Sequence, residues 1–268
     1  MNSKLNRLFK KYKSDKYEHR YSEVYDNFFL NLKDKKLKIL EIGVADGSSI
    51  KAWSDFFKKS TIIGFDIKKI DLKKKRLIRD NIEIHCGSQI DKTFINSLIL
   101  RYGKFDIIID DGSHFPKHVI KTFDLLFNSL ANNGIYFVED TQTSYNHYFG
   151  GNAFDLKFSN THVNYFKSLA DTLNYQEIAN PYYTKNKYDG SIKNISFFHN
   201  MIVIKKGVNN VKSKLVLNNS YEDKRYKSRL RTKGNKTRYF IKYLIIFKTY
   251  TFLLFIFNLF KKIILLRY

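Results

Sequence analysis

Two acidic pairs and a histidine stand out as side chains that could do chemistry. Asp110 and Asp111 follow the apolar run FDIII, and His114 comes three residues after Asp111. Glu139 and Asp140 close the next apolar run, GIYFV. Neighbouring parallel strands lie about 4.8 Å apart, so four such carboxylates would crowd one rim and repel one another. A hard divalent cation such as Mg²⁺ relieves that repulsion, so the sequence predicts a metal site there.

His114 is the residue of this group that could move a proton. An alcohol must lose its proton to attack a methyl sulfonium, and an imidazole can accept that proton when a metal has lowered the alcohol's pKa. The alternative is a surface or helix-capping histidine. For the acids, the alternative is separate roles, with some capping helices and others facing solvent.

A glycine-bearing turn, EIGVADG, follows the first predicted strand. Its glycines allow a close backbone approach to a ligand, and Gly43 is the first of them. A dinucleotide site would show G-x-G-x-x-G, whereas this turn carries the acidic residues Glu41 and Asp46, which would repel a pyrophosphate. Carboxylates suit a cationic ligand with a ribose and an amino group. We therefore predict S-adenosylmethionine rather than a nicotinamide dinucleotide.

Two further strand ends extend this predicted pocket. Asp66 ends the run GFD, where a carboxylate can accept hydrogen bonds from both ribose hydroxyls. Gln89 follows the third strand, where an adenine amino group is expected. An acidic strand end taken alone is more often a helix cap, so the prediction rests on successive strand ends together.

Strands and helices alternate from residue 36 to residue 206. The strands are continuous apolar runs, which indicate a parallel sheet covered on both faces, and hence an open, doubly wound α/β fold. A helix is expected near 163–173. The runs NYQEIAN and SFFHNMIVIKK are expected to form two final strands, as an antiparallel hairpin. In such sheets ligands bind beyond the carboxyl ends of the strands.

Charge and apolar character divide the remainder of the chain. The net charge is +23, and residues 211–268 hold fifteen basic residues against two acidic ones. Residues 239–268 are mainly apolar, but their longest uncharged stretch, Thr249–Phe260, is shorter than the roughly 20 residues that span a bilayer. We predict an N-terminal helical cap over 1–35, a catalytic domain over 36–206, and a basic linker with a membrane-interface tail over 207–268.

The tail and the single cysteine also bear on location. The tail suits an anionic membrane surface, and the alternative is a helix docked on the body or on a second subunit of a homo-oligomer. Residues 1–16 lack the apolar core of a secretory signal. Cys86 is the sole cysteine, so no intrachain disulfide can form, and we expect it to be a buried strand residue. These features predict a cytoplasmic protein, peripheral on the inner face of the cell membrane.

The chain resembles a known family over roughly residues 8–205. The segments that carry the resemblance are KYKSDKYEHRYSEVYDNFF, LEIGVADGSSIKAW, GFDI, FDIIIDDGSH and YFVEDTQTSY. They are similar to the metal-dependent macrolide-glycoside O-methyltransferases. They also resemble a broader group of bacterial sugar and polysaccharide methyltransferases, some of them called cephalosporin hydroxylase-like. The resemblance implies a Rossmann-like class I methyltransferase sheet.

The resemblance also implies roles for individual residues. Asp111, Glu139 and Asp140 would bind Mg²⁺, and His114 would be the general base, with Asp111 sharing in catalysis. S-adenosylmethionine contacts are implied at Glu41, Gly43, Asp66 and Gln89. The segment with Ser14, Asp15 and Tyr21 would close over the cofactor, and Thr141–Tyr145 would lie at the substrate mouth. Asp110 could hold either the backbone or the cofactor.

The predicted activity is methyl transfer from S-adenosylmethionine to a sugar hydroxyl, assisted by Mg²⁺. The acceptor would be a glycan, a polysaccharide precursor or a nucleotide sugar. One alternative, suggested by the positive charge, is an RNA methyltransferase, but the chain lacks a base-clamping motif such as N-P-P-Y after the fourth strand, so a nucleic-acid partner is not expected. Another is a membrane-associated scaffold that keeps the fold without turnover.

Overall fold

The computed structural model describes residues 3–178, 180, 182–210, 216–217 and 220–221. The chain forms two units, Met1–Tyr175 with Asn186–Asn210, and Gln176–Lys185 with Val211–Tyr268. In the second unit, β8 (Val216–Leu217) pairs with β9 (Ser220–Tyr221). The apolar segment predicted to bind a membrane lies outside the described residues. Among the residues that are described, no helix has the length and apolar character needed to cross a membrane.

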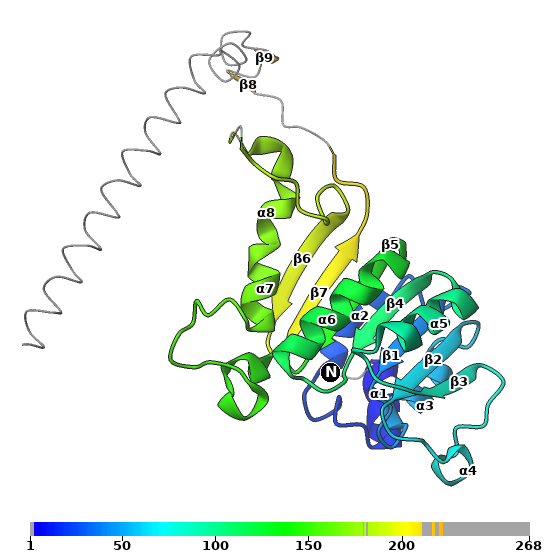
Figure 1. The fold of residues 1–268 in the computed structure, drawn as a ribbon. Helices are drawn as coiled ribbons and strands as arrows, with labels where there is room; N and C mark the ends of the chain where they lie inside the picture. Colours follow the sequence, from blue (N-terminus) through cyan, green and yellow to red (C-terminus); the bar gives the residue numbers. More distant parts are fainter. Residues whose placement is uncertain (1–2, 179, 181, 211–215, 218–219, 222–268) are drawn as a thin grey trace, which may run out of the picture. The chain divides into compact units, whose positions relative to one another are not determined.

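A seven-stranded sheet forms the centre of the first unit, in the order β3-β2-β1-β4-β5-β7-β6 (Figure 1). Five strands are parallel to one another, namely β1 (Lys38–Ile42), β2 (Thr61–Asp66), β3 (Ile82–Cys86), β4 (Phe105–Asp110) and β5 (Leu130–Glu139). β7 (Met201–Lys206) is antiparallel both to β5 and to β6 (Ile192–Phe198). The predicted fold class, a mostly parallel sheet that ends in an antiparallel hairpin, is confirmed.

Helices cover both faces of the sheet because the central strands are apolar on both. One core cluster contains side chains of α5 (Lys92–Tyr102), α6 (Pro116–Leu126) and α7 (His162–Ser168). The other contains those of α1 (Lys4–Tyr12), α2 (Ser22–Phe29) and α3 (Ser48–Phe56). The shorter elements are α4 (Leu72–Lys75), α8 (Ala170–Leu173), η1 (Phe127–Ser129), η2 (Thr141–Tyr145), η3 (His147–Phe149) and η4 (Tyr175–Glu177).

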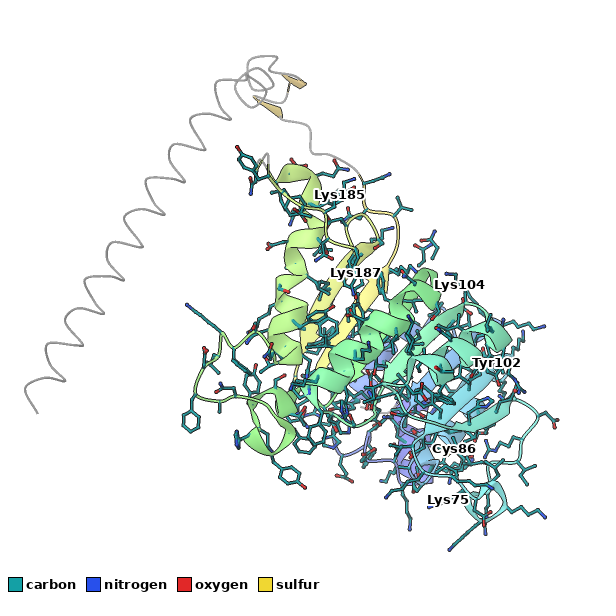
Figure 2. All side chains as sticks on the ribbon, in the orientation of Figure 1. Lys75, Cys86, Tyr102, Lys104, Lys185 and Lys187 are labelled. Atoms are coloured by element: carbon teal, nitrogen blue, oxygen red, sulfur yellow. The ribbon has the colours of Figure 1, made fainter. Side chains whose placement is uncertain are left out.

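Two local predictions are wrong. The run NYQEIAN is not a strand, because Tyr175–Glu177 form a 3-10 turn; the hairpin lies entirely within 192–206. Its strands meet at Asn200, whose φ of 57° is a conformation that asparagine tolerates in tight turns. Cys86 is in a strand, but it is exposed, since it is the last residue of the edge strand β3 (Figure 2).

Candidate active site

The register of the parallel strands brings the predicted site residues to one rim. Ile42 of β1 lies beside Asp110 of β4, and Asp110 lies beside Val138 of β5. The residues that follow these three positions therefore leave the sheet side by side. This alignment explains why side chains far apart in the sequence can form one site, as expected for a parallel sheet.

Gly43 makes the closest backbone approach at this rim. It has a φ of 87°, and its N–H donates to the Phe65 carbonyl at 2.9 Å. A Cβ at this position would lie 2.1 Å from the carbonyl oxygen of Asp111. The Asp111 N–H in turn donates to the Ile42 carbonyl at 3.0 Å. The turn after β1 and the turn after β4 therefore fix each other, and glycine is required where they meet.

Two of the predicted cofactor residues hold this turn through its backbone. Asp66 accepts hydrogen bonds from the N–H groups of Val44 at 3.0 Å and Ala45 at 2.9 Å. Asp46 accepts from both the N–H and the hydroxyl of Ser48, at the start of α3. Partial burial opposes ionisation of Asp46, but the bonds from Ser48 outweigh it and lower its pKa. Their contacts to a cofactor stay predictions, and the structure adds that both carboxylates hold the turn after β1.

Glu41 lies beneath the turn and is completely buried. Its carboxylate accepts from the Ser49 hydroxyl at 2.9 Å and from the Trp53 indole N–H at 3.1 Å, and it lies 3.6 Å from the Lys16 ammonium. Burial raises the pKa of Glu41 to about 7, although the nearby ammonium opposes this. Glu41 therefore ties α3 to the base of the site.

Gln89 and Asp110 form a second buried support. The Gln89 side chain accepts from the Ser113 N–H at 2.8 Å and donates to the Thr122 hydroxyl at 2.9 Å and to Asp110 at 3.3 Å. Asp110 also accepts from the Tyr136 hydroxyl at 3.1 Å, and burial raises its pKa to about 7. Asp110 is therefore held by buried side chains, and its choice between backbone and cofactor stays a prediction. Gln89 likewise fixes the turn that leads to His114.

A buried lysine lies among the acids at the end of β4 and β5. Lys16 donates to Asp111 Oδ2 at 2.5 Å and to Glu139 Oε2 at 2.6 Å. The Tyr25 hydroxyl donates to the other oxygen of Glu139. Burial raises the pKa of Asp111 and of Glu139, with Lys16 opposing the shift in both. Burial disfavours the ammonium of Lys16, but the surrounding carboxylates outweigh it and raise the lysine's pKa.

Asp140 is held by Tyr21. The Tyr21 hydroxyl donates to Asp140 Oδ1 at 2.6 Å, and Tyr21 is itself almost completely buried. Asp140 has a φ of 52°, in the left-handed region, and directly follows the last residue of β5. Burial would raise the pKa of Asp140, but the bond from Tyr21 and the nearby His114 outweigh it and lower the pKa. Tyr21, predicted to contact the cofactor, directly supports a predicted metal ligand.

His114 completes the group of possible ligands. Its Nε2 lies 3.8 Å from Asp111 Oδ1 and 3.6 Å from Asp140 Oδ2. Among the described residues, Asp111, His114 and Asp140 each offer a donor atom within 4.8 Å of the others. The carbonyl of His114 accepts from the Thr143 hydroxyl at 2.9 Å, which joins η2 to this turn. Carboxylate oxygens at this separation fit a hard cation, while Glu139 lies behind them against Lys16.

Sequence reasoning missed Lys16 and Tyr25. Both belong to the segment KSDKYEHRYSEVY, which contributed to the family resemblance, but lysine and tyrosine in a polar segment are ordinarily read as exposed. The spacing of Tyr21 and Tyr25, four residues apart at the start of α2, is a signal that both rings face the same side. The chain contains no comparable signal for the burial of Lys16.

The chain is similar in sequence to curated O-methyltransferases. No protein-family model matches the chain. It is 34% identical over 199 residues to mycinamicin VI 2''-O-methyltransferase of Micromonospora griseorubida, covering 71% of this chain and 49% of that protein. It is 34% identical over 215 residues to demethylmacrocin O-methyltransferase of Streptomyces fradiae, covering 76% and 53%. The chain therefore spans about half the length of the curated relatives it matches.

The solved structures agree with the curated relatives. The MycE methyltransferase of mycinamycin biosynthesis, solved in complex with Mg and SAH, superposes with a TM-score of 0.73 and 32% identity over 78% of this chain and 56% of that one. A second structure of MycE, which also contains mycinamycin VI, gives a TM-score of 0.72. The chain has the class I methyltransferase fold, and its similar sequences include O-methyltransferases that act on sugar-bearing molecules.

Proposed function

We propose that this chain is an S-adenosylmethionine-dependent O-methyltransferase that acts on a sugar hydroxyl and uses Mg²⁺. The observation that carries the proposal is the convergence of Asp111, His114 and Asp140 within 4.8 Å, beside the glycine turn at Gly43. The similarity to sugar O-methyltransferases, and the Mg and SAH in the MycE complex, support the same activity.

The cofactor pocket would lie at the turn after β1. Gly43, Asp46 and Asp66 would face S-adenosylmethionine, with Glu41 and Gln89 holding the walls of the pocket from inside. Acidic side chains there suit a sulfonium ligand and disfavour a pyrophosphate. Asp111 and Asp140, with Glu139, would hold Mg²⁺. When bound, S-adenosylmethionine supplies an electrophilic methyl group and Mg²⁺ lowers the pKa of a coordinated alcohol.

The residues of the chain would orient the acceptor and move its proton. His114 would take the proton from the attacking hydroxyl as the oxygen bonds to the methyl carbon and the carbon–sulfur bond breaks. Its Nε2 lies 3.6 Å from Asp140 Oδ2 and 3.8 Å from Asp111 Oδ1, so the ring is at the point where the possible metal ligands converge. The bond from Thr143 to the His114 carbonyl fixes the backbone on which the ring is mounted.

The acceptor would lie along an aromatic rim. Phe115 follows His114 and contacts the ring of Phe149 at 5.5 Å, and Tyr148 and Phe154 are 82% and 102% exposed. Exposed aromatic rings offer the flat apolar faces that sugars and apolar aglycones contact. We propose a sugar carried on a glycan, a polysaccharide precursor, a glycolipid or a nucleotide sugar. Among the sugar O-methyltransferases, we propose that this chain groups with the polysaccharide and cephalosporin hydroxylase-like methyltransferases.

The activity is tested by incubating the full chain with labelled S-adenosylmethionine and a panel of sugar nucleotides, capsule-type oligosaccharides and glycosides. Transfer should require Mg²⁺, and undiminished turnover after thorough chelation would refute the metal role. His114→Ala should lower kcat by about 100-fold or more. His85→Ala is the matched control, because this histidine lies in the edge strand β3 and its ring contacts Tyr102 of α5. Transfer to RNA but to no sugar in the panel would favour the RNA methyltransferase alternative.

We also propose that residues 207–268 hold the enzyme at an anionic membrane. Support comes from the sequence, in which basic residues precede and interrupt an apolar aromatic segment. Flotation of the full chain with vesicles that contain phosphatidylglycerol, at low and high salt, tests this. Equal recovery with and without the anionic lipid would count against it.

A further inference from the structure

Lys16 occupies an unusual position for a lysine. It lies between α1 and α2, and its side chain is 1% exposed. Its ammonium lies within 2.6 Å of Asp111 Oδ2 and Glu139 Oε2 and 3.6 Å from Glu41 Oε1. A buried ammonium is costly unless it is paired and hydrogen-bonded, so a lysine here must be compensated by these carboxylates.

The chain turns inward to place this side chain. Lys13 ends α1 in the left-handed conformation, with a φ of 56°. The Ser14 N–H then donates to the Phe9 carbonyl at 3.0 Å, and the Tyr17 N–H donates to the Ser14 carbonyl at 3.0 Å. These bonds fix the backbone on both sides of Lys16. The N-terminal segment therefore fixes the backbone from which the Lys16 ammonium reaches the carboxylates at the rim of the sheet.

The two oxygens of each aspartate face different neighbours. Asp111 Oδ2 accepts from the Lys16 ammonium, while Asp111 Oδ1 lies 3.8 Å from His114 Nε2. Asp140 Oδ1 accepts from the Tyr21 hydroxyl, while Asp140 Oδ2 lies 3.6 Å from the same imidazole nitrogen. One oxygen of each carboxylate is thus held by the N-terminal segment. The other is turned toward the place where the possible ligands converge.

Glu139 is held at both oxygens. Lys16 donates to Oε2 at 2.6 Å, and the hydroxyl of the fully buried Tyr25 donates to Oε1. The Tyr25 ring packs against Trp53 and Phe137, at 5.0 and 4.7 Å, so its hydroxyl has little freedom to move. Loss of a group that orients a ligating carboxylate typically lowers metal affinity by about 10- to 100-fold.

We infer that Lys16, together with Tyr25, is a positioning residue for the divalent-cation site. It holds Asp111 and Glu139 from the protein side and offsets part of their charge, so that the acids can gather before a metal binds. The inference rests on the metal-assisted function proposed above. It assigns to the segment between α1 and α2 a direct part in building that site.

The test measures binding of Mn²⁺, by the loss of the free-ion electron paramagnetic resonance signal, to the full chain and its variants. Lys16→Met keeps most of the length of the side chain without its charge and should weaken Mn²⁺ binding by about 10- to 100-fold. Tyr25→Phe should weaken it by about ten-fold, the lower end of that range. Lys11→Met is the control, because Lys11 belongs to the neighbouring helix but is 60% exposed and pairs with Asp55.

Two further measurements separate this role from a general loss of structure. The affinity for S-adenosylhomocysteine should change far less than the affinity for Mn²⁺. The melting temperature shows whether each variant is folded at the temperature of the binding assay. If Lys16→Met does not fold, Tyr25→Phe decides the question alone. Unchanged Mn²⁺ binding in the folded variants overturns the inference. Tighter binding by Lys16→Met also overturns it, since the lysine would then be a competitor of the metal.

The wild-type result distinguishes the inference from the proposed function. Wild-type binding of Mn²⁺ that persists in Lys16→Met overturns the inference and leaves the proposed function intact. A wild-type chain that binds no Mn²⁺ overturns the metal part of the proposed function, and the inference with it. Methyl transfer that survives chelation would overturn both in the same way, through a separate assay.

Discussion

Substitution of Gly43 by alanine tests whether the two turns at the rim fix each other. The new Cβ would lie 2.1 Å from the Asp111 carbonyl oxygen, whereas ordinary contact begins at 3.4 Å, so the Asp111 backbone must move by about 1 Å. A displacement of this size in a positioned group can cost about 100-fold in rate. The left-handed φ of 87° adds about 1–2 kcal/mol of backbone strain in the folded state.

Gly150 provides a control that separates strain from displacement. Its φ is 78°, close to that of Gly43, but a Cβ there would meet nothing within 4 Å. Gly150→Ala should therefore show the strain in a urea titration without a comparable loss of kcat. Gly43→Ala should show a similar or larger loss of stability and a fall in kcat of about 100-fold. Equal kcat values for the two variants would refute the argument that Gly43 positions Asp111.

Two further predictions concern buried side chains. Burial lowers the pKa of His162 to about 4 from its ordinary 6.5, so between these values the unfolded chain takes up a proton that the folded chain does not. The free energy of unfolding should therefore fall by up to about 3 kcal/mol as pH drops from 6.5 to 4. His162→Phe should remove this pH-dependent part of the stability. Equal pH dependence in urea titrations of the wild type and the variant would contradict the prediction. Gln89→Leu should lower the free energy of unfolding by about 2–4 kcal/mol in the same assay at pH 7, because it leaves the Ser113 N–H and the Thr122 hydroxyl without their side-chain partner. A loss under about 0.5 kcal/mol would contradict the support role of Gln89.

The parallel strands could be predicted because each is an apolar run that ends at a turn. FDIIID and TIIGFD are buried along most of their length, as expected for strands covered on both faces. The β6–β7 hairpin was harder to predict, because the run SFFHNMIVIKK contains parts of both strands. Only the local conformation of Asn200, with a φ of 57°, shows where one strand ends and the next begins.

The candidate site was predictable where it depends on the sheet. Strand-end acids are visible in the sequence, and the parallel register brings Asp111 and Asp140 together with His114. What each acid touches was not predictable, because a carboxylate can hold a ligand or a backbone amide equally well. Asp66 shows this, since it accepts from two N–H groups of the turn after β1.

The partners of the acids come from a segment that the sheet does not predict. The sheet collects Glu41, Asp111, Glu139 and Asp140 at one rim, where repulsion would otherwise favour their protonation or separation. Lys16 supplies a cation, and the hydroxyls of Tyr21 and Tyr25 supply donors. These three side chains approach from 16–25, outside the alternating strands and helices. The strands therefore determine which acids meet, and the N-terminal segment determines how those acids can be kept ionised and oriented. A fragment that begins at β1 would keep the acids but lose these partners, so it is not a minimal form of this site.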